Sequence, residues 1–117
     1  MRMPPFNLHN PSTLEDALTK ASELESSGEE FDWVSGGTDL IPNYKWHLNT
    51  KKNVISLSGI EELHELGLNK IGAMVTLQEL AESSSVHPLI SEVAGKVASI
   101  MVRRSATLGG NICLDTR

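Results

Sequence analysis

Residues 33–40 read Trp33-Val34-Ser35-Gly36-Gly37-Thr38-Asp39-Leu40, an apolar run that enters a pair of glycines and leaves through a threonine and an aspartate. Glycine has no Cβ, so Gly36 and Gly37 can take positive φ and let a ligand approach the main chain. Thr38 and Asp39 can cap a following helix, whose first N–H groups add partial positive charge. Successive amides in such a turn can hold a phosphate. A strand-to-helix turn that needs its glycines only for geometry explains the same residues.

The composition is typical of a globular protein with one core. A chain of 117 residues is too short for two independent large domains. Net charge is −5 and the basic residues are scattered, which argues against a nucleic-acid partner. No apolar run approaches the roughly 20 residues that span a bilayer. The first residues lead into no signal-peptide core, so we expect a cytoplasmic location.

Cysteine and histidine usage excludes several kinds of site. Cys113 is the single cysteine, so the chain can form no internal disulfide and no cysteine-based zinc or iron–sulfur site of its own. No catalytic base is evident beside it, and we interpret it as a buried structural residue. The four histidines share no metal-ligand spacing.

The first half of the chain alternates helix and strand patterns. A helix is predicted over residues 12–28, because Ser12 and Glu15 fit a capping box and Gly28 stands where a helix stops. Residues 31–34 predict a short buried strand, and residues 39–47 a short helix. In that helix we expect Tyr44 and Trp46 to be packing residues. A second strand is predicted at 54–57.

The second half continues the alternation. Glutamates at 61, 62 and 65 interleave with apolar residues, which indicates a solvated face rather than catalytic carboxylates. Residues 70–75 predict a third strand, and Thr76 with Glu79 a capping box for a helix over 76–82. Pro88 begins another helix, whose interior Gly95 indicates close packing. The fold class expected is α/β (α+β), a small sheet flanked by helices.

A second diglycine turn lies near the end of the chain, in Ala106-Thr107-Leu108-Gly109-Gly110-Asn111-Ile112. Two such turns on one small α/β unit could hold two linked phosphates from both sides. Neither matches the GxGxxG dinucleotide fingerprint or the GxxxxGK[ST] phosphate loop, so ATP hydrolysis is disfavoured. No nucleophile constellation is evident, and we therefore predict no catalytic residue. A bound phosphate-bearing cofactor would bring the chemistry.

Together, the two glycine motifs resemble the FAD-binding domain of the molybdenum hydroxylases. That family includes the medium subunits of carbon monoxide dehydrogenase and 4-hydroxybenzoyl-CoA reductase, and the flavin portion of xanthine dehydrogenase. Residues 11–18, 71–80 and 97–104 also resemble family segments, so the likeness covers nearly the whole chain. The ending Cys113-Leu114-Asp115-Thr116-Arg117 looks most like the 4-hydroxybenzoyl-CoA reductase branch.

The resemblance implies a p-cresol methylhydroxylase-like fold in which both glycine turns grip the FAD diphosphate and its flanking groups. Val97 and Ala98 are weaker candidates for contacts on the adenosine side. The implied cofactor-binding residues are Val34, Ser35, Gly36, Gly37, Thr38, Asp39, Ala106, Thr107, Gly109, Gly110 and Asn111. The implied function is that of an FAD-dependent oxidoreductase component. Its electrons would pass to or from the molybdenum cofactor of a large subunit and the 2Fe–2S clusters of a small subunit.

The chain departs from the family in length. The family domain is more than twice as long, so we expect residues 1–117 to be its N-terminal portion, without the second lobe that covers the isoalloxazine ring. Asp115 stands too close to the second motif to be equated with the family's ribose-binding acid. The alternative is a non-catalytic nucleotide-binding or assembly fragment that keeps the fold without productive flavin binding.

Overall fold

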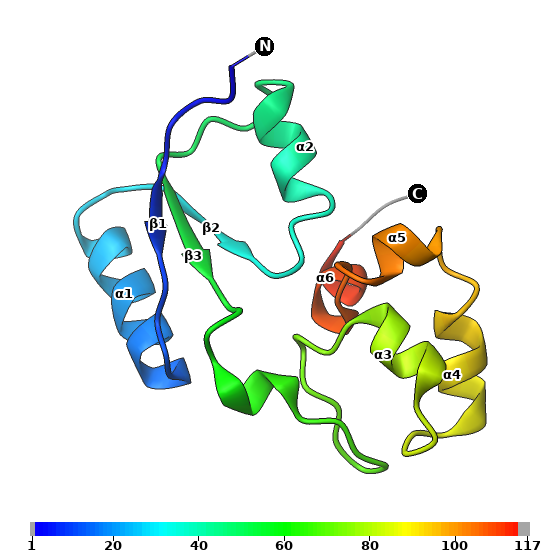
Figure 1. The fold of residues 1–117 in the computed structure, drawn as a ribbon. Coiled ribbons are helices and arrows are strands. Elements are labelled where there is room, and N and C mark those ends of the chain that lie inside the picture. Colours follow the sequence, from blue (N-terminus) through cyan, green and yellow to red (C-terminus); the bar gives the residue numbers. More distant parts are fainter. Residues whose placement is uncertain (1, 115–117) are drawn as a thin grey trace. The chain divides into compact units, whose positions relative to one another are not determined.

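The computed structural model describes residues 2–114. These residues form two compact units, the first ending at Glu61 and the second beginning at Glu62. Each unit has a hydrophobic cluster of its own. The two are described separately below, with the element labels of Figure 1.

The first unit is a three-stranded parallel sheet with two helices. Its elements are β1 (Asn7–His9), α1 (Leu14–Ser26), β2 (Phe31–Val34), α2 (Leu40–Lys45) and β3 (Asn53–Ser56). The strand order is β1-β3-β2, so β3 is central and all four of its residues are buried. Val54 lies opposite Leu8 in β1 and Asp32 in β2. The predicted strands at 31–34 and 54–57 are therefore confirmed, the second shifted by one residue toward the N-terminus.

Helix α1 covers the sheet through a small apolar contact. Ala21 and Leu24 pack with Ile55 of β3 and with Phe31. The predicted cap is one residue off: Thr13, not Ser12, caps the helix, and its Oγ1 accepts from the Asp16 N–H at 3.0 Å. Gly28 follows the helix at a φ of 75°, as a helix stop requires.

Two expectations for the first unit are wrong. Strand β2 lies at the edge of the sheet and is only half-buried, with Trp33 41% exposed, because β3 covers it on one side only. Trp46 is 69% exposed and is not a packing residue, since it follows the last residue of α2. Tyr44, by contrast, is fully buried, and its ring lies 5.2 Å from that of Phe6.

Tyr44 makes the first unit sensitive to alkaline pH. Its hydroxyl donates to the Lys51 carbonyl at 3.0 Å. Burial raises the pKa of Tyr44 above its usual 10.0, and the negative charge of Asp32 and a hydrogen bond to it raise the pKa further. In the unfolded chain the tyrosine ionises first. The neutral form therefore stabilises the fold below about pH 10, and this stabilisation is lost progressively as pH rises through the folded-state pKa.

We expect the free energy of unfolding to fall above pH 10 more steeply in the wild type than in Tyr44→Phe, which has no group to ionise there. The variant should lose about 1 kcal/mol at neutral pH, the usual value of one hydrogen bond. Urea unfolding at a series of pH values measures both effects. Because Tyr44 is the only tyrosine, tyrosinate absorbance reports its titration directly. Parallel pH profiles for the two proteins would contradict the assignment.

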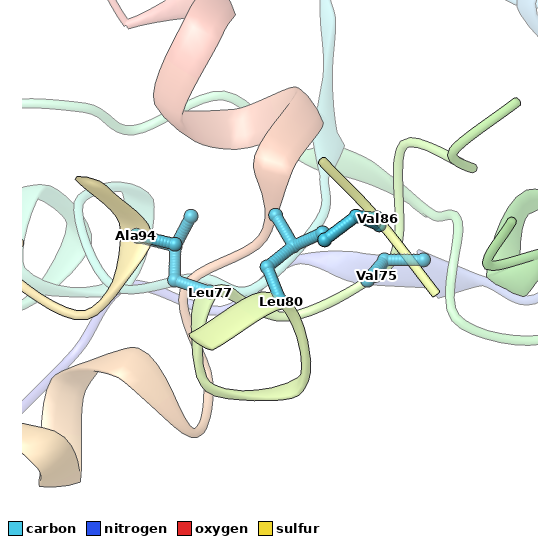
Figure 2. Packing of buried hydrophobic residues seen from close by; sticks show 5 residues of the cluster. All are labelled: Val75, Leu77, Leu80, Val86 and Ala94. Atoms are coloured by element: carbon cyan, nitrogen blue, oxygen red, sulfur yellow. The ribbon is translucent and has the colours of Figure 1, made fainter. Parts of the chain in front are cut away.

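The second unit is mainly helical. It contains α3 (Leu77–Glu82), α4 (Pro88–Ala94), α5 (Ile100–Arg103) and α6 (Leu108–Cys113), and the 3₁₀ turn η1 (Glu61–His64) leads into it. Its core joins the segment before α3 to α3, α4 and the loop between them. Figure 2 shows the buried residues Val75, Leu77, Leu80, Val86 and Ala94.

The capping box that begins α3 is confirmed. Thr76 Oγ1 accepts from the Glu79 N–H at 3.1 Å, and the Glu79 carboxylate accepts from the Thr76 N–H at 3.3 Å. The helix ends at Glu82 as predicted. The glutamates at 61, 62 and 65 are exposed while Ile60 is buried, which agrees with the predicted solvated face.

Two other expectations for this unit are wrong. Residues 70–75 form no strand, because Ile71 makes only an isolated bridge to Leu66 and the following residues bond to η1 and its neighbours. Gly95 caps the end of α4 instead of lying in its interior. A Cβ there would meet its nearest neighbour at 3.5 Å, an ordinary contact, so no close packing requires glycine.

Candidate functional site

The first glycine turn connects β2 to α2 in the predicted order of strand, turn and helix. Val34 ends the strand and Leu40 begins the helix. Gly37 has a φ of 74°, whereas Gly36 is not among the described glycines with positive φ. The Gly37 carbonyl accepts from the Ile41 N–H at 3.1 Å, which links the turn to the helix. The expectation of positive φ is therefore confirmed for the second glycine only.

The turn is accessible to a ligand over part of its length. Residues 34–37 are half-buried, and Thr38 and Asp39 are exposed. A Cβ on Gly37 would lie 3.1 Å from Ile41 Cγ1 and 3.6 Å from Val34 Cγ2. A side chain at this position would therefore occupy space beside the turn. The φ of 74° would also be unfavourable for any residue that has a Cβ.

Asp39 occupies the N-cap position of α2 but does not act as a cap. Its backbone is already helical, and its side chain makes no capping hydrogen bond. The carboxylate instead accepts from Asn43 Nδ2 at 3.0 Å, one turn along the helix. The predicted helix cap is thus wrong at the level of the side chain, while the helix start itself is confirmed.

The second motif is the start of a helix, not an open turn. Thr107 caps α6, and its Oγ1 accepts from the Gly110 N–H at 3.1 Å. Both glycines therefore lie in the first turn of the helix. The Thr107 side chain is buried and used for capping, so Gly110 and the exposed Asn111 are the more accessible part of the motif.

A neighbouring segment, residues 73–77, holds the second motif in place. The Ala106 carbonyl accepts from the Leu77 N–H at 2.8 Å, and the Leu108 N–H donates to the Val75 carbonyl at 2.9 Å. The Gly109 N–H donates to the Ala73 carbonyl, also at 2.9 Å. Sequence reasoning missed this pairing, because an isolated bridge between Thr76 and Thr107 leaves no periodic pattern.

Gly109 has a packing role of its own. A Cβ on it would lie 2.8 Å from Ala73 Cβ and 2.9 Å from the Ala73 carbonyl oxygen, closer than real Cβ atoms approach. The structural explanation of the glycines is therefore sufficient for Gly109.

The structure brings the predicted cofactor-binding residues together as two groups. Residues 34–39 are contiguous in the first unit, and residues 106–111 in the second. Cys113 is exposed, which corrects its interpretation as a buried residue: the short helix α6 ends there, at the surface of its unit. Asp115 lies outside the described residues.

The first unit also contains a polar cluster that sequence reasoning missed. The Asp32 carboxylate accepts from Asn49 Nδ2 at 2.5 Å and from Lys51 Nζ at 2.9 Å. An open depression beside it is lined by Glu30, Asn43, Leu48, Asn49, Thr50 and Lys51. The one sequence signal for this cluster is a charged residue, Asp32, within a predicted strand.

Residues 2–114 contain no group of three or more His, Cys, Asp or Glu side chains that could hold a metal ion. Within the same residues, no helix is both long and apolar enough to cross a membrane.

A family model described as the FAD binding domain in molybdopterin dehydrogenase matches residues 4–117. The chain is 28% identical over 113 residues to the xanthine dehydrogenase FAD-binding subunit of Escherichia coli O157:H7, covering 90% of this chain and 37% of that one. It is 30% identical over 116 residues to the carbon monoxide dehydrogenase medium chain of Hydrogenophaga pseudoflava, covering 93% and 39%.

A solved structure agrees with these relatives. Carbon monoxide dehydrogenase from Hydrogenophaga pseudoflava, in a form that lacks the Mo-pyranopterin moiety, matches with a TM-score of 0.85 and 28% identity. The match covers 96% of this chain and 40% of that one. The chain thus spans about two fifths of the length of these relatives.

Proposed function

We propose that this chain, which belongs to the family of FAD-binding domains of molybdopterin dehydrogenases, holds FAD through its two glycine motifs. Residues 1–117 would form one portion of a larger FAD-binding domain. The observation that carries the proposal is the turn between β2 and α2, where Gly37 takes a φ of 74° in a half-buried, ligand-accessible backbone.

The residues present fit a diphosphate. Oxygen atoms of a diphosphate accept hydrogen bonds, and backbone N–H groups in glycine turns donate them without a side chain in the way. From the first motif, Val34, Ser35, Gly36, Gly37, Thr38 and Asp39 would line the cofactor, with the N–H groups of 36–38 as donors. From the second, Gly110 and the Asn111 side-chain amide would line it directly, without the Gly110 N–H, which already donates to Thr107 Oγ1. Ala106, Thr107 and Gly109 would act by fixing the backbone, since their groups are used for capping and packing.

Bound FAD would supply the redox chemistry, and the chain would bind and orient it. Asp39 is the one ionisable side chain of the two motifs, and its carboxylate accepts a hydrogen bond from Asn43, so we propose no acid–base residue. We further propose that the whole protein is the flavin component of a multisubunit molybdenum-containing oxidoreductase in the cytoplasm. Its partners would be a molybdenum-binding large subunit and a 2Fe–2S small subunit. Membership of the 4-hydroxybenzoyl-CoA reductase branch stays a prediction.

One observation favours a second candidate, a nucleotide-binding or assembly fragment without productive flavin binding. Gly109 and Thr107 each have a complete structural explanation that needs no cofactor. In that case the second motif would serve only to join α6 to residues 73–77.

Flavin binding distinguishes the two candidates. We expect the purified chain, and any longer polypeptide that its reading frame encodes, to carry flavin absorbance and to bind added FAD with a saturable quenching of flavin fluorescence. Heat-released flavin should chromatograph as FAD rather than FMN. Absence of binding by both polypeptides would overturn the proposal and leave the assembly fragment.

A further inference from the structure

Arg103, at the end of α5, connects three parts of the second unit through its side chain. Its Nε donates to Gln78 Oε1 of α3 at 2.9 Å. Its Nη1 donates to the carbonyl oxygens of Val97 and Ala98, each at 3.0 Å. The side chain is half-buried. Three hydrogen bonds from one guanidinium to two other segments exceed what a solvated surface arginine makes.

The segment that Arg103 holds is strained. Ala98 has a φ of 49°, a left-handed conformation that costs a residue with a Cβ about 1–2 kcal/mol. Hydrogen bonds from a charged donor to the carbonyls on either side of this conformation offset part of that cost. Lysine could not replace the arginine here, because one ammonium cannot reach the Gln78 oxygen and both carbonyls in the fixed geometry of the guanidinium fork.

The three hydrogen bonds of the Arg103 side chain form a brace, and the position of Arg103 in the chain links this brace to the second glycine motif. The Ala106 N–H donates to the Val102 carbonyl at 2.8 Å, so the motif begins on the last turn of α5. The Ala106 carbonyl in turn accepts from Leu77, the residue before Gln78. Arg103 therefore joins α5 to α3 at the point where both contact the start of the motif.

We propose that Arg103 is a positioning residue, which uses its bonds to the turn at 97–98 and to Gln78 to fix residues 106–111 for the FAD that this motif would bind. The inference rests on the proposed function. Arg103 would act through the backbone it holds, without contacting the reacting atoms. A merely structural arginine would instead affect FAD only to the extent that it affects folding.

The test measures both FAD affinity and stability for each variant of the full chain. Arg103→Ala and Arg103→Lys remove the brace, and Gln78→Leu removes its Nε partner only. Val86→Ala is the matched control, since it removes buried volume from the core of the same unit and leaves every hydrogen-bond partner of Arg103 in place. Urea unfolding ranks the stabilities, and flavin fluorescence gives Kd.

We expect Arg103→Ala and Arg103→Lys to weaken FAD binding at least about tenfold, the effect of one charge-assisted hydrogen bond on an equilibrium constant. Gln78→Leu should have a smaller effect, and Val86→Ala should leave Kd within about twofold. Added methylguanidinium should restore part of the affinity of Arg103→Ala. If Arg103→Ala binds FAD as Val86→Ala does, the positioning role is wrong while FAD binding stands. If the wild type binds no FAD, the proposed function fails first.

Discussion

Replacing Gly37 with valine should abolish FAD retention while the chain stays folded. The glycine has a φ of 74°, which a β-branched residue almost never adopts, and the new Cβ would lie 3.1 Å from Ile41 Cγ1. The backbone of the turn must therefore rearrange and move the N–H groups proposed to meet the diphosphate. Strain of this kind costs about 1–3 kcal/mol, which a surface turn outside the buried clusters can absorb without unfolding the unit. Flavin content after gel filtration and circular dichroism measure the two effects.

Gly28→Val is the matched control for this experiment. Gly28 has a φ of 75° but nothing within 4 Å of the Cβ position, and it lies between α1 and β2, outside both motifs. It should lose similar stability and keep FAD. Gly110→Val tests the second motif and should also lose FAD. Unchanged flavin affinity in both Gly37→Val and Gly110→Val would show that the two motifs are structural only.

Replacing Gly72 with alanine should strongly destabilise the second unit. The added Cβ would overlap the Leu63 carbonyl and lie 3.0 Å from the Glu65 nitrogen. Neither side can move freely, because the Gly72 N–H donates to the Glu65 carbonyl at 2.7 Å and the Met74 N–H to the Leu63 carbonyl at 2.9 Å. We expect a loss of about 3 kcal/mol in the free energy of unfolding, at the upper end of overpacking effects. Urea denaturation measures it.

Gly67→Ala provides the comparison within the same unit. A Cβ there would meet only the Lys70 carbonyl oxygen at 3.6 Å, an ordinary contact, and its φ is not positive. Its effect should stay within about 0.5 kcal/mol. Equal losses in Gly67→Ala and Gly72→Ala would show that the close approach to Leu63 does not determine the stability of this unit.

Local signals in the sequence predicted the elements that depend on local contacts. The capping box of Thr76 and Glu79 and the helix stop at Gly28 need only residues within a few positions of each other. The strand at 31–34 was also predicted correctly, because its apolar residues end at a glycine pair. Where two hydroxyl residues are adjacent, as Ser12 and Thr13 are, the pattern does not identify which one caps the helix, and the structure uses Thr13.

Two larger errors concern pairing between distant residues. Strand β1 has three residues and is defined by its partner, β3, more than forty positions later, so no periodic pattern marks it. Residues 70–75 have the composition of a strand but lack a continuous partner, since Gly72 and Met74 bond to residues 65 and 63. Composition alone could not distinguish the real strand β1 from the strand-like residues 70–75.

For the candidate site, too, the features that depend on local sequence were predicted and those that depend on long-range contacts were not. The diglycine patterns located both motifs, and the order of strand, turn and helix around Gly37 is confirmed. The pattern could not show that Thr107 is a buried cap or that Gly109 packs against Ala73. Those roles depend on residues 73–77, whose pairing with the motif is long-range.

Competition by ADP against FAD, with riboflavin as the comparison, tests the central claim most directly. If the two glycine motifs hold the diphosphate, ADP should displace FAD from the full chain and bind by itself in isothermal titration. Riboflavin, which has no phosphate, should do neither. Binding of riboflavin as tight as that of FAD, with no displacement by ADP, would contradict the account, because recognition would then lie at the isoalloxazine ring and not at the glycine motifs.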